Sequence, residues 1–398
     1  MSLTSLQQER AFAALNSFSI ELPSWGFANT GTRFGKFIQA GAATTTPEKI
    51  ADAGQVHRFT GCCPTVAMHV LWDFPSGLGD VPAVLAAATQ SGVRIGAINP
   101  NVFQDQQYKH GSLGNPDAAV RAMALQHILD CVEIQKETGS RDLSLWFADG
   151  TSFPGSGSVR SRKRWFQQGL ARVHEALPEK ARMLVEYKPF EPAFYATDIA
   201  DWGMAYLMAK SSGEKARVLV DTGHHYQAQN IEQIVAWLLD EDMLGGFHFN
   251  DRRYADDDLT LGSIDPYQVF RIFHEICFWE WENQRRADIA YMVDQSHNLK
   301  NKIEEMIQTA MTAQELYLKA ALVDHEALAA AQADSEIVDA EECLRAAFFT
   351  DVRPVLREWR QALGLAPEPL KAFRACGYLE QAALERGPKN LGAVSSYA

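Results

Sequence analysis

Three features are scarce in this chain of 398 residues: long apolar runs, paired cysteines and an excess of positive charge. No segment approaches the roughly 18 consecutive apolar residues of a membrane-spanning helix, and the start of the chain lacks a basic stretch followed by an apolar one. We therefore expect no membrane partner and a cytoplasmic location. The six cysteines form no C-x-x-C pair, which suits a reducing compartment and offers no zinc-site spacing.

The charge balance is the second exclusion. The chain carries 37 basic and 50 acidic side chains, a formal net charge of −13. Nucleic-acid affinity comes mainly from Lys and Arg that neutralise phosphates, so we expect no nucleic-acid partner. Because 46% of the residues are hydrophobic, the chain can bury a large core, which excludes disorder as its main state.

What is present is a repeated alternation of short apolar runs and segments with helical periodicity, the pattern of β-α units. We expect strands over residues 18–25, 65–71, 93–98, 142–147, 182–186, 217–221, 245–249 and 289–293. The amphipathic segments between them predict helices, among them 117–136, 160–176, 198–209, 231–240 and 266–281. Eight such units predict an α/β fold, a closed (β/α)8 TIM barrel, although the alternation alone would also permit a doubly wound sheet.

The last hundred residues differ from the rest. They contain no convincing strand and are rich in Ala, Glu, Leu, Lys and Gln, with helices expected over 303–323 and 337–349. We expect a barrel over residues 1–298, a helical extension over 299–386 that serves contacts between subunits, and a flexible tail over 387–398.

Four of the expected strands end in an ionisable residue. Strands of a parallel sheet are buried on both faces, so such groups are costly unless they face the open end of the barrel or bind a ligand. In a barrel all four would meet at the C-terminal rim, and the crowding of three carboxylates with an imidazole favours a divalent cation. The alternative is that each acid caps the following helix. The four residues are Glu186, Asp221, His248 and Asp294.

A second group of possible ligands follows these strand ends. His224 lies three residues after Asp221, and Asp256 and Asp258 follow His248 in an acidic loop. Their D-x-D spacing lets both carboxylates of an extended loop face the same way, so one imidazole and two carboxylates form a plausible second metal site. Taken alone, the acidic run is more typical of a solvated turn. Lys188, two residues after Glu186, would point to the same side and donate a hydrogen bond to a substrate oxygen; the alternative is a surface lysine.

The order of these residues resembles that of a known family. Glu-x-Lys-Pro at 186–189, Asp-x-x-His at 221–224, His248, Asp-x-Asp at 256–258 and Asp294 resemble the ligands of two-metal sugar isomerases with xylose-isomerase-like barrels. Five further segments and the C-terminal Arg-Ala-Cys-Gly-Tyr at 374–378 resemble the L-rhamnose isomerase family. The five are Pro-Ser-Trp-Gly near residue 25, Gly-Thr-Arg-Phe at 31–34, Glu-Pro-Ala-Phe-Tyr at 191–195, Gly-Gly-Phe-His-Phe-Asn-Asp at 245–251 and Asp-Gln-Ser-His-Asn at 294–298.

The resemblance implies two divalent ions, described as Mn²⁺ in this family, with Co²⁺ or Mg²⁺ as alternatives. Glu186, Asp221, His248 and Asp294 would hold the structural ion, and His224, Asp256 and Asp258 the catalytic one. The chain departs from xylose isomerases, which carry Glu at the position of Asp221 and Asp at that of His248. Tyr187 also stands where some relatives of the rhamnose branch carry histidine.

The implied activity is aldose–ketose isomerisation of L-rhamnose to L-rhamnulose, with tolerance of other aldoses. In a metal-assisted hydride shift, Lys188 would polarise O1 and Asp258 would orient a water molecule, with Asp294 also at the reaction centre; an enediol route is the other possibility. The alternative function is a metal-dependent sugar epimerase that acts by proton transfer, against which the second metal trio argues. A barrel endonuclease conflicts with the acidic charge, and an inert interaction protein conflicts with seven ionisable residues in ligand order.

Further residues are expected at the sugar. His69, near the end of the second strand, would assist ring opening, although a buried core histidine is nearly as compatible with the sequence. Trp72 and Trp146 would stack on apolar sugar faces, or else pack in the core. Ser296 would contact a sugar hydroxyl. Phe34 would cover the site of a neighbouring subunit, since the family's assembly implies a homotetramer.

Overall fold

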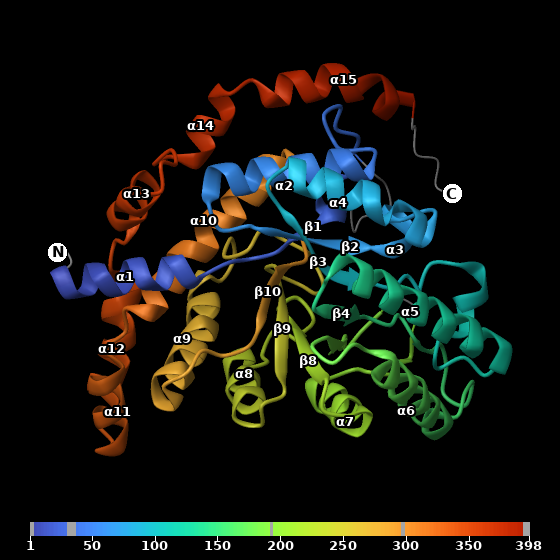
Figure 1. Ribbon diagram of the computed structural model, residues 1–398. Coiled ribbons are helices and arrows are strands. Elements are labelled where there is room, and N and C mark those ends of the chain that lie inside the picture. The colour runs from blue at the N-terminus through green and yellow to red at the C-terminus, as the bar shows by residue number, and fades with distance from the viewer. Residues whose placement is uncertain (1–3, 30–36, 192–193, 296–298, 393–398) are drawn as a thin grey trace.

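The core of the fold is a barrel of eight parallel strands (Figure 1). The computed structural model describes residues 4–29, 37–191, 194–295 and 299–392. The strands follow one another around the sheet in the order β1 (Leu22–Pro23), β2 (Thr65–His69), β3 (Arg94–Asn99), β4 (Asp142–Leu145), β6 (Arg182–Glu186), β8 (Ala216–Asp221), β9 (Leu244–Phe249) and β10 (Ala290–Val293).

The sheet closes on itself at Glu21, directly before β1. The Glu21 N–H donates to the carbonyl of Tyr291 at 2.8 Å, and the Val293 N–H donates to the carbonyl of Glu21 at 3.0 Å. These two bonds join the first strand to the last, so the predicted TIM barrel is confirmed and the doubly wound sheet is excluded.

The first two strands are shorter than predicted. β1 covers only two residues of the expected run and gives way to the 3-10 helix η1 (Ser24–Phe27). β2 stops at His69, where the helical turn α3 (Val70–Asp73) begins, so Trp72 lies on a turn just above the strand. Both differences bring aromatic side chains close to the open end of the barrel.

A ring of eight helices surrounds the strands. Seven of these helices begin at a Thr, Ser, Asp or Asn whose side chain accepts a backbone N–H of the first turn, which explains where they start. The ring consists of α2 (Thr46–Thr60), α4 (Val81–Gln90), α5 (Ala118–Thr138), α6 (Val159–Ala176), α7 (Trp202–Ser212), α8 (Ile231–Asp240), α9 (Pro266–Asn283) and α10 (Lys302–Ala321).

Helix α10 begins after the expected boundary at residue 298. It follows the eighth strand and packs against both α9 and α2, so it completes the ring and belongs to the eighth β-α unit. The extension beyond the barrel therefore begins after α10. It consists of α11 (His325–Ala333), α12 (Ile337–Phe349), α13 (Arg353–Ala362), α14 (Pro369–Ala375) and α15 (Tyr378–Gly392). No described helix is both long and apolar enough to cross a membrane.

The N-terminal helix α1 (Ser5–Ser17) packs with the C-terminal helices rather than with the strands. Ala11 and Leu15 join an apolar cluster with Leu318 of α10 and with Leu356 and Trp359 of α13. In Figure 1, α13, α14 and α15 form an arc that ends beside α2. The helical extension thus contacts the rest of the protein through the N-terminal helix α1 as well as through α10.

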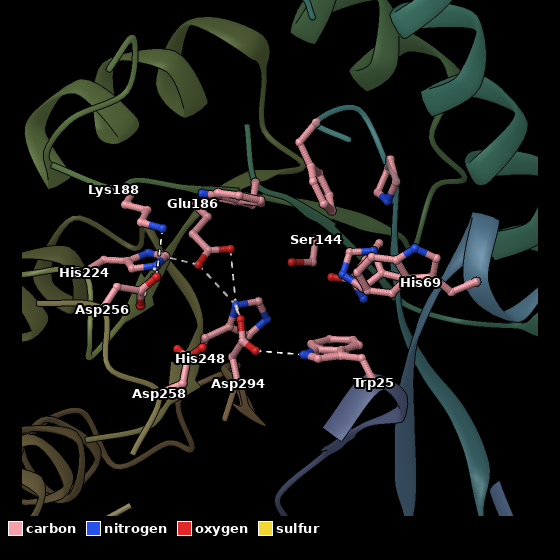
Figure 2. A pocket seen from close by; sticks show the side chains of 15 residues that line it. Trp25, His69, Ser144, Glu186, Lys188, His224, His248, Asp256, Asp258 and Asp294 are labelled. Atoms are coloured by element: carbon pink, nitrogen blue, oxygen red, sulfur yellow. Dashed lines mark hydrogen bonds and ion pairs between the residues drawn. The ribbon is translucent and has the colours of Figure 1, made fainter. Parts of the chain in front are cut away.

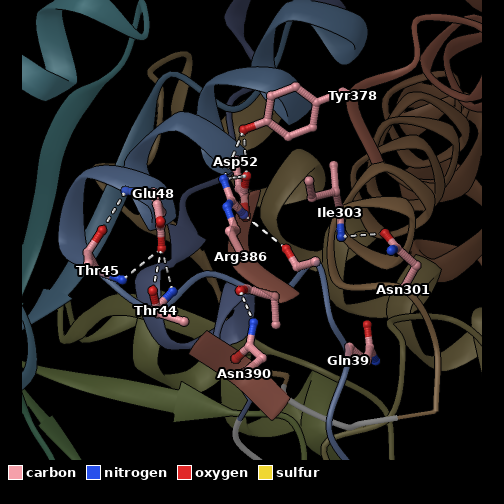
Figure 3. A network of polar contacts seen from close by, with 12 residues as sticks. Gln39, Thr44, Thr45, Glu48, Asp52, Asn301, Ile303, Tyr378, Arg386 and Asn390 are labelled. Atoms are coloured by element: carbon pink, nitrogen blue, oxygen red, sulfur yellow. Dashed lines mark hydrogen bonds and ion pairs between the residues drawn. The ribbon is translucent and has the colours of Figure 1, made fainter. Parts of the chain in front are cut away.

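Helix α15 is fixed to α2 by buried polar contacts (Figure 3). Arg386 donates to Asp52 of α2 at 2.7 and 2.9 Å, and the Asn390 side chain donates to the carbonyls of Ala40 and Ala42 at 2.9 Å. The helix continues to Gly392, so residues 387–392 of the expected tail are helical, while residues 393–398 lie outside the described part of the chain.

Side chains that point into the barrel come from every second residue of each strand. At the C-terminal ends these are polar. Two residues deeper, an apolar cluster forms a floor across five strands: Ala67, Ala97, Leu184, Leu219 and Met292, with Trp25 packed on it. The ionisable strand ends therefore lie above this layer of apolar side chains, at the rim where barrel enzymes place their sites.

Candidate metal centre

A cavity of about 190 Å³ opens at the C-terminal ends of the strands (Figure 2). Ionisable groups line it on the side of β6 to β10, and aromatic rings line it on the side of β1 to β4. The lining residues are Trp25, His69, Trp72, Asn99, Pro100, Phe103, Ser144, Trp146, Glu186, Lys188, His224, His248, Asp256, Asp258 and Asp294.

The first group of possible metal ligands is formed by Glu186, Asp221 and His248, the ends of three neighbouring strands. Their candidate ligand atoms all lie within 4.8 Å of one another. His248 Nδ1 lies 3.2 Å from Glu186 Oε2 and 3.8 Å from Asp294 Oδ2. The structure thus brings all four strand-end residues of the sequence prediction together, and all but Asp221 line one side of the cavity.

The second group is formed by Asp221, His224 and Asp256, again within 4.8 Å of one another. His224 Nε2 lies 3.3 Å from Asp256 Oδ1. Asp221 belongs to both groups, which the sequence did not indicate. Asp258 lines the same cavity without joining either group; its φ of +49° lies in the left-handed region, which is uncommon for a residue other than glycine.

The charges in this cluster shift one another's titration. Burial alone would raise the pKa of Glu186, but the imidazoles of His248 and His224 lower it to about 2. Against the opposing effect of burial, the same carboxylate raises the pKa of His248 to about 9. Burial raises the pKa of Asp221 to about 7, and burial together with Asp256 raises that of Asp258 well above its ordinary value. Without a cation, the cluster holds protons instead.

An unpaired oxygen of Asp221 supports a bound cation. Asp221 Oδ2 is buried and has no hydrogen-bond partner among the described residues, which is costly unless a ligand completes it. His248 Nε2 is also buried without a partner among them, but the nitrogen of His248 that faces Glu186 is Nδ1. The other oxygen of Asp221 accepts from the Gly223 N–H at 2.6 Å and from Asn250 Nδ2 at 2.9 Å. A Cβ at Gly223 would lie 2.6 Å from Asn250 Oδ1, 3.1 Å from Asp221 Oδ1 and 3.2 Å from Asp256 Oδ1, so glycine lets the backbone pass close to the partner of Asp221 and to both carboxylates. Oxygen-rich donors with imidazole fit a divalent cation such as Mn²⁺.

Lys188 reaches the cavity from the loop after β6, as its spacing from Glu186 predicted. Its ammonium lies 2.8 Å from Asp256 Oδ2 and 2.8 Å from Glu191 Oε2. Although burial opposes it, the charge of Asp256 raises the pKa of Lys188 above its ordinary value. Lys188 is therefore a protonated hydrogen-bond donor at neutral pH, and not a base.

The opposite side of the cavity is an aromatic wall around His69. The His69 ring lies 4.7 Å from that of Trp25, 4.2 Å from that of Trp72 and 5.8 Å from that of Phe103, measured between centroids. Burial lowers the pKa of His69 to about 3, so its imidazole is neutral at physiological pH. Trp146 packs on Phe103 at 4.9 Å and lies under the ammonium of Lys188 at 5.2 Å.

Among the predicted sugar-contacting residues, His69, Trp72, Trp146 and Lys188 line the cavity, whereas Phe34 and Ser296 lie outside the described residues. The sequence prediction missed Trp25, Phe103, Asn99 and Ser144. Asn99 could have been found, because it ends β3 as Glu186 ends β6. Ser144 could have been found from its spacing of two residues to Trp146.

Comparison with known proteins agrees with this geometry. Residues 65–283, more than half of the chain, match the family described as xylose isomerase-like TIM barrel. The chain belongs to that family. It is 41% identical over 379 residues to a probable sugar isomerase of Rhizobium meliloti, covering 94% of this chain and 87% of the relative, and 40% identical with the same coverage to one of Mesorhizobium japonicum. It is 26% identical over 228 residues to a xylose isomerase of Thermus thermophilus, 55% of this chain and 57% of that one.

Solved structures of similar fold include sugar epimerases. An L-ribulose 3-epimerase matches 81% of this chain and 98% of its own with a TM-score of 0.55 and 13% identity. A D-allulose 3-epimerase from Methylomonas sp. matches 74% of this chain and 95% of its own with a TM-score of 0.53 and 14% identity. At these identities the likeness concerns the fold alone.

Proposed function

We propose that this protein is a divalent-metal-dependent aldose–ketose isomerase that converts L-rhamnose to L-rhamnulose and tolerates other aldoses. The observation that carries the proposal is the pair of carboxylate–imidazole groups that share Asp221 beside a small cavity with an aromatic wall. Similarity to probable sugar isomerases along nearly the whole chain supports the class of reaction. The choice of L-rhamnose rests on the sequence motifs.

The two ligand groups would hold two divalent ions, with Mn²⁺ as the first candidate. Glu186, Asp221, His248 and Asp294 would hold one ion, and His224, Asp256 and Asp258, beside the shared Asp221, the other. The ions would supply Lewis acidity at two neighbouring sugar oxygens. The side chains around them bind and orient the sugar and exclude water.

Lys188 would donate a hydrogen bond to the O1 oxygen of the sugar. Its two carboxylate neighbours keep the ammonium protonated and fix its position at 2.8 Å from each. A buried cation directed at an oxygen on which negative charge develops stabilises the transition state. Lys188 therefore acts without giving up its proton.

His69 would open the sugar ring. Its Nδ1 is buried and has no partner in the described structure, and its low pKa keeps the ring neutral. A neutral imidazole next to the anomeric hydroxyl of the sugar can take the proton of that hydroxyl and return one to the ring oxygen. Trp25 and Trp72 on either side of it would cover the apolar face of the sugar and exclude water.

The first experiment is an aldose screen. Protein stripped of metal and reloaded with Mn²⁺ should form ketose from L-rhamnose, and the stripped protein should not. Asp256→Asn should lower kcat/KM at least 100-fold. Asp257→Asn is the matched control, because Asp257 accepts the backbone N–H groups of Arg253 and Tyr254 instead of facing the cavity. Turnover without metal, or equal losses in both variants, would contradict the proposal.

Isotope transfer separates the two routes of isomerisation, and the identity of the product separates isomerisation from the epimerase alternative. With C2-deuterated L-rhamnose in water, a hydride shift leaves the label at C1 of the ketose, whereas loss of the label to water indicates an enediol. Interconversion of two ketoses without aldose formation would instead identify an epimerase.

Assembly is a further part of the proposal. We propose a cytoplasmic homotetramer in which Phe34 and the helices that follow α10 contribute to contacts between subunits. Light scattering on the full-length protein tests this; a fully active monomer would contradict it.

A further inference from the structure

Ser144 is a polar residue in the apolar floor of the cavity. It lies on β4, pairs in register with Leu184 of β6, and is two residues deeper than Trp146. The other inward residues at this depth are apolar: Ala67, Ala97, Leu184, Leu219 and Met292. An alanine at this position would match Ala97 of the neighbouring strand β3 and Ala67 of β2 beyond it, so the hydroxyl is not explained by packing.

The Ser144 hydroxyl has no use within the protein. Ser144 is 2% exposed, and its Oγ has no hydrogen-bond partner among the described residues. Trp146 Nε1, on the same face of the chain, is also buried without a partner. A buried polar atom left unpaired destabilises the fold, so such atoms in a cavity are expected to meet a ligand or an ordered water molecule. Both residues line the cavity described above.

The position of Ser144 relative to the two ligand groups selects which part of a sugar it meets. In Figure 2, Ser144 lies between Glu186 and His69, on the side away from His224 and Asp256. A sugar whose C1 and C2 oxygens approach the ligand groups and Lys188 extends its remaining carbons over this floor. The side chains of the floor on β2 and β3 are the small ones of Ala67 and Ala97.

We propose that Ser144 is a specificity residue that hydrogen-bonds a hydroxyl on a sugar carbon remote from the ligand groups. The inference rests on the proposed isomerase function. It defines the substrate class as aldoses that carry this remote hydroxyl, as opposed to analogues that lack it. A site built to bond a hydroxyl rejects the deoxy compound strongly, because the protein group is then buried without a partner.

The test compares Ser144→Ala with wild type on the aldoses that the Mn²⁺-loaded enzyme accepts and on their 3-, 4- and 5-deoxy analogues. We expect Ser144→Ala to lose about tenfold in kcat/KM on the parent aldose, the worth of about one hydrogen bond. On one of the deoxy analogues the two enzymes should agree within about twofold. Ser212→Ala, which removes a buried hydroxyl that already donates to the carbonyl of Met208, is the control and should not discriminate.

Two further measurements exclude a merely structural effect. Ser144→Ala should bind Mn²⁺ as wild type does, and its Tm should be unchanged or higher, since it removes an unpaired buried group. Ser144→Thr, which restores the hydroxyl, should regain the preference for the parent aldose. Equal losses on all sugars, no loss on any, or a lowered Tm would overturn the inference.

The outcomes also separate this inference from the function on which it rests. The inference alone is overturned if the wild type is active and depends on Mn²⁺, but Ser144→Ala does not distinguish the parent aldose from its deoxy analogues. A wild type that neither binds Mn²⁺ nor forms ketose overturns the proposed function, and the inference with it.

Discussion

The indole Nε1 of Trp25 donates a hydrogen bond to Asp294 Oδ1 at 2.9 Å. This bond crosses the closure of the barrel, from η1 after the first strand to the residue after the eighth. The second oxygen of Asp294 faces His248 of the first ligand group. Trp25 thus fixes the carboxylate so that one oxygen is directed at that group, as partners of metal ligands commonly do.

Replacement of Trp25 by Phe should therefore weaken metal binding. The variant keeps an aromatic ring against His69 but removes the donor, and loss of such a partner typically costs about 10- to 100-fold in metal affinity. Calorimetric titration of stripped protein with Mn²⁺ measures this. Trp72→Phe is the control, because its indole donates to Gln104 and not to a ligand. Equal affinities in both variants would show that Trp25 does not orient Asp294.

Replacement of Asp221 should lower the binding of two ions, because its carboxylate lies within both ligand groups. We expect Asp221→Asn to lower the Mn²⁺ content after dialysis from two ions to fewer than one per chain, whereas Asp256→Asn should retain one. Elemental analysis of dialysed protein gives the count. Retention of two ions by Asp221→Asn would mean that the residue is only a structural partner of Asn250 and Gly223.

The sequence predicts the strands and the ionisable rim well for a physical reason. Parallel strands buried on both faces must be apolar, so a run that ends in Glu186 or Asp221 marks both a strand and its open end. Trp25 and Ser144 were missed because their direction depends on strand register and on the early end of β1, which no local pattern reveals. The place of α10 in the ring could not be predicted, because α10 resembles any amphipathic helix until its packing between α9 and α2 is known. The pairing of Arg386 with Asp52 could not be predicted either, because the two residues lie 334 positions apart in the sequence.

That long-range pair predicts a large loss of stability. Arg386 and Asp52 have side chains 6% and 1% exposed, so Arg386→Met would leave a carboxylate buried without its partner, at a cost of about 3–5 kcal/mol in the free energy of unfolding. Urea unfolding measures the loss, and hydrogen exchange should show faster exchange in α15. Arg374→Met removes an exposed ion pair to Glu304 and should cost less than about 1 kcal/mol. Similar losses of stability in the two variants would show that the buried Arg386–Asp52 pair does not contribute more than an exposed ion pair.

Glu21 predicts how stability changes with pH. Its backbone closes the barrel, and its carboxyl reaches β3, where it accepts the Ala97 N–H at 2.8 Å. The carboxyl fits there because residue 96 is glycine; a Cβ at that position would lie 1.7 Å from Glu21 Oε2. Burial raises the pKa of Glu21 from 4.5 to about 7. The folded state therefore holds this proton more tightly than the unfolded state, and the resulting stabilisation is full below pH 4.5 and is lost as the pH rises through 7.

Glu21→Gln should remove that pH dependence, because the amide keeps an oxygen for the Ala97 N–H and does not ionise. At pH 8 the variant should be more stable than wild type by up to about 3 kcal/mol, since each pKa unit corresponds to about 1.4 kcal/mol, and near pH 4.5 the two should agree. Urea unfolding at pH 5, 6, 7 and 8 measures the difference, with exposed Glu133→Gln as the control. A difference that stays constant from pH 5 to pH 8 would mean that Glu21 does not titrate in this window. A variant less stable at every pH would mean that the amide fits the barrel closure poorly, and that the carboxyl is needed there for its shape and not for its proton.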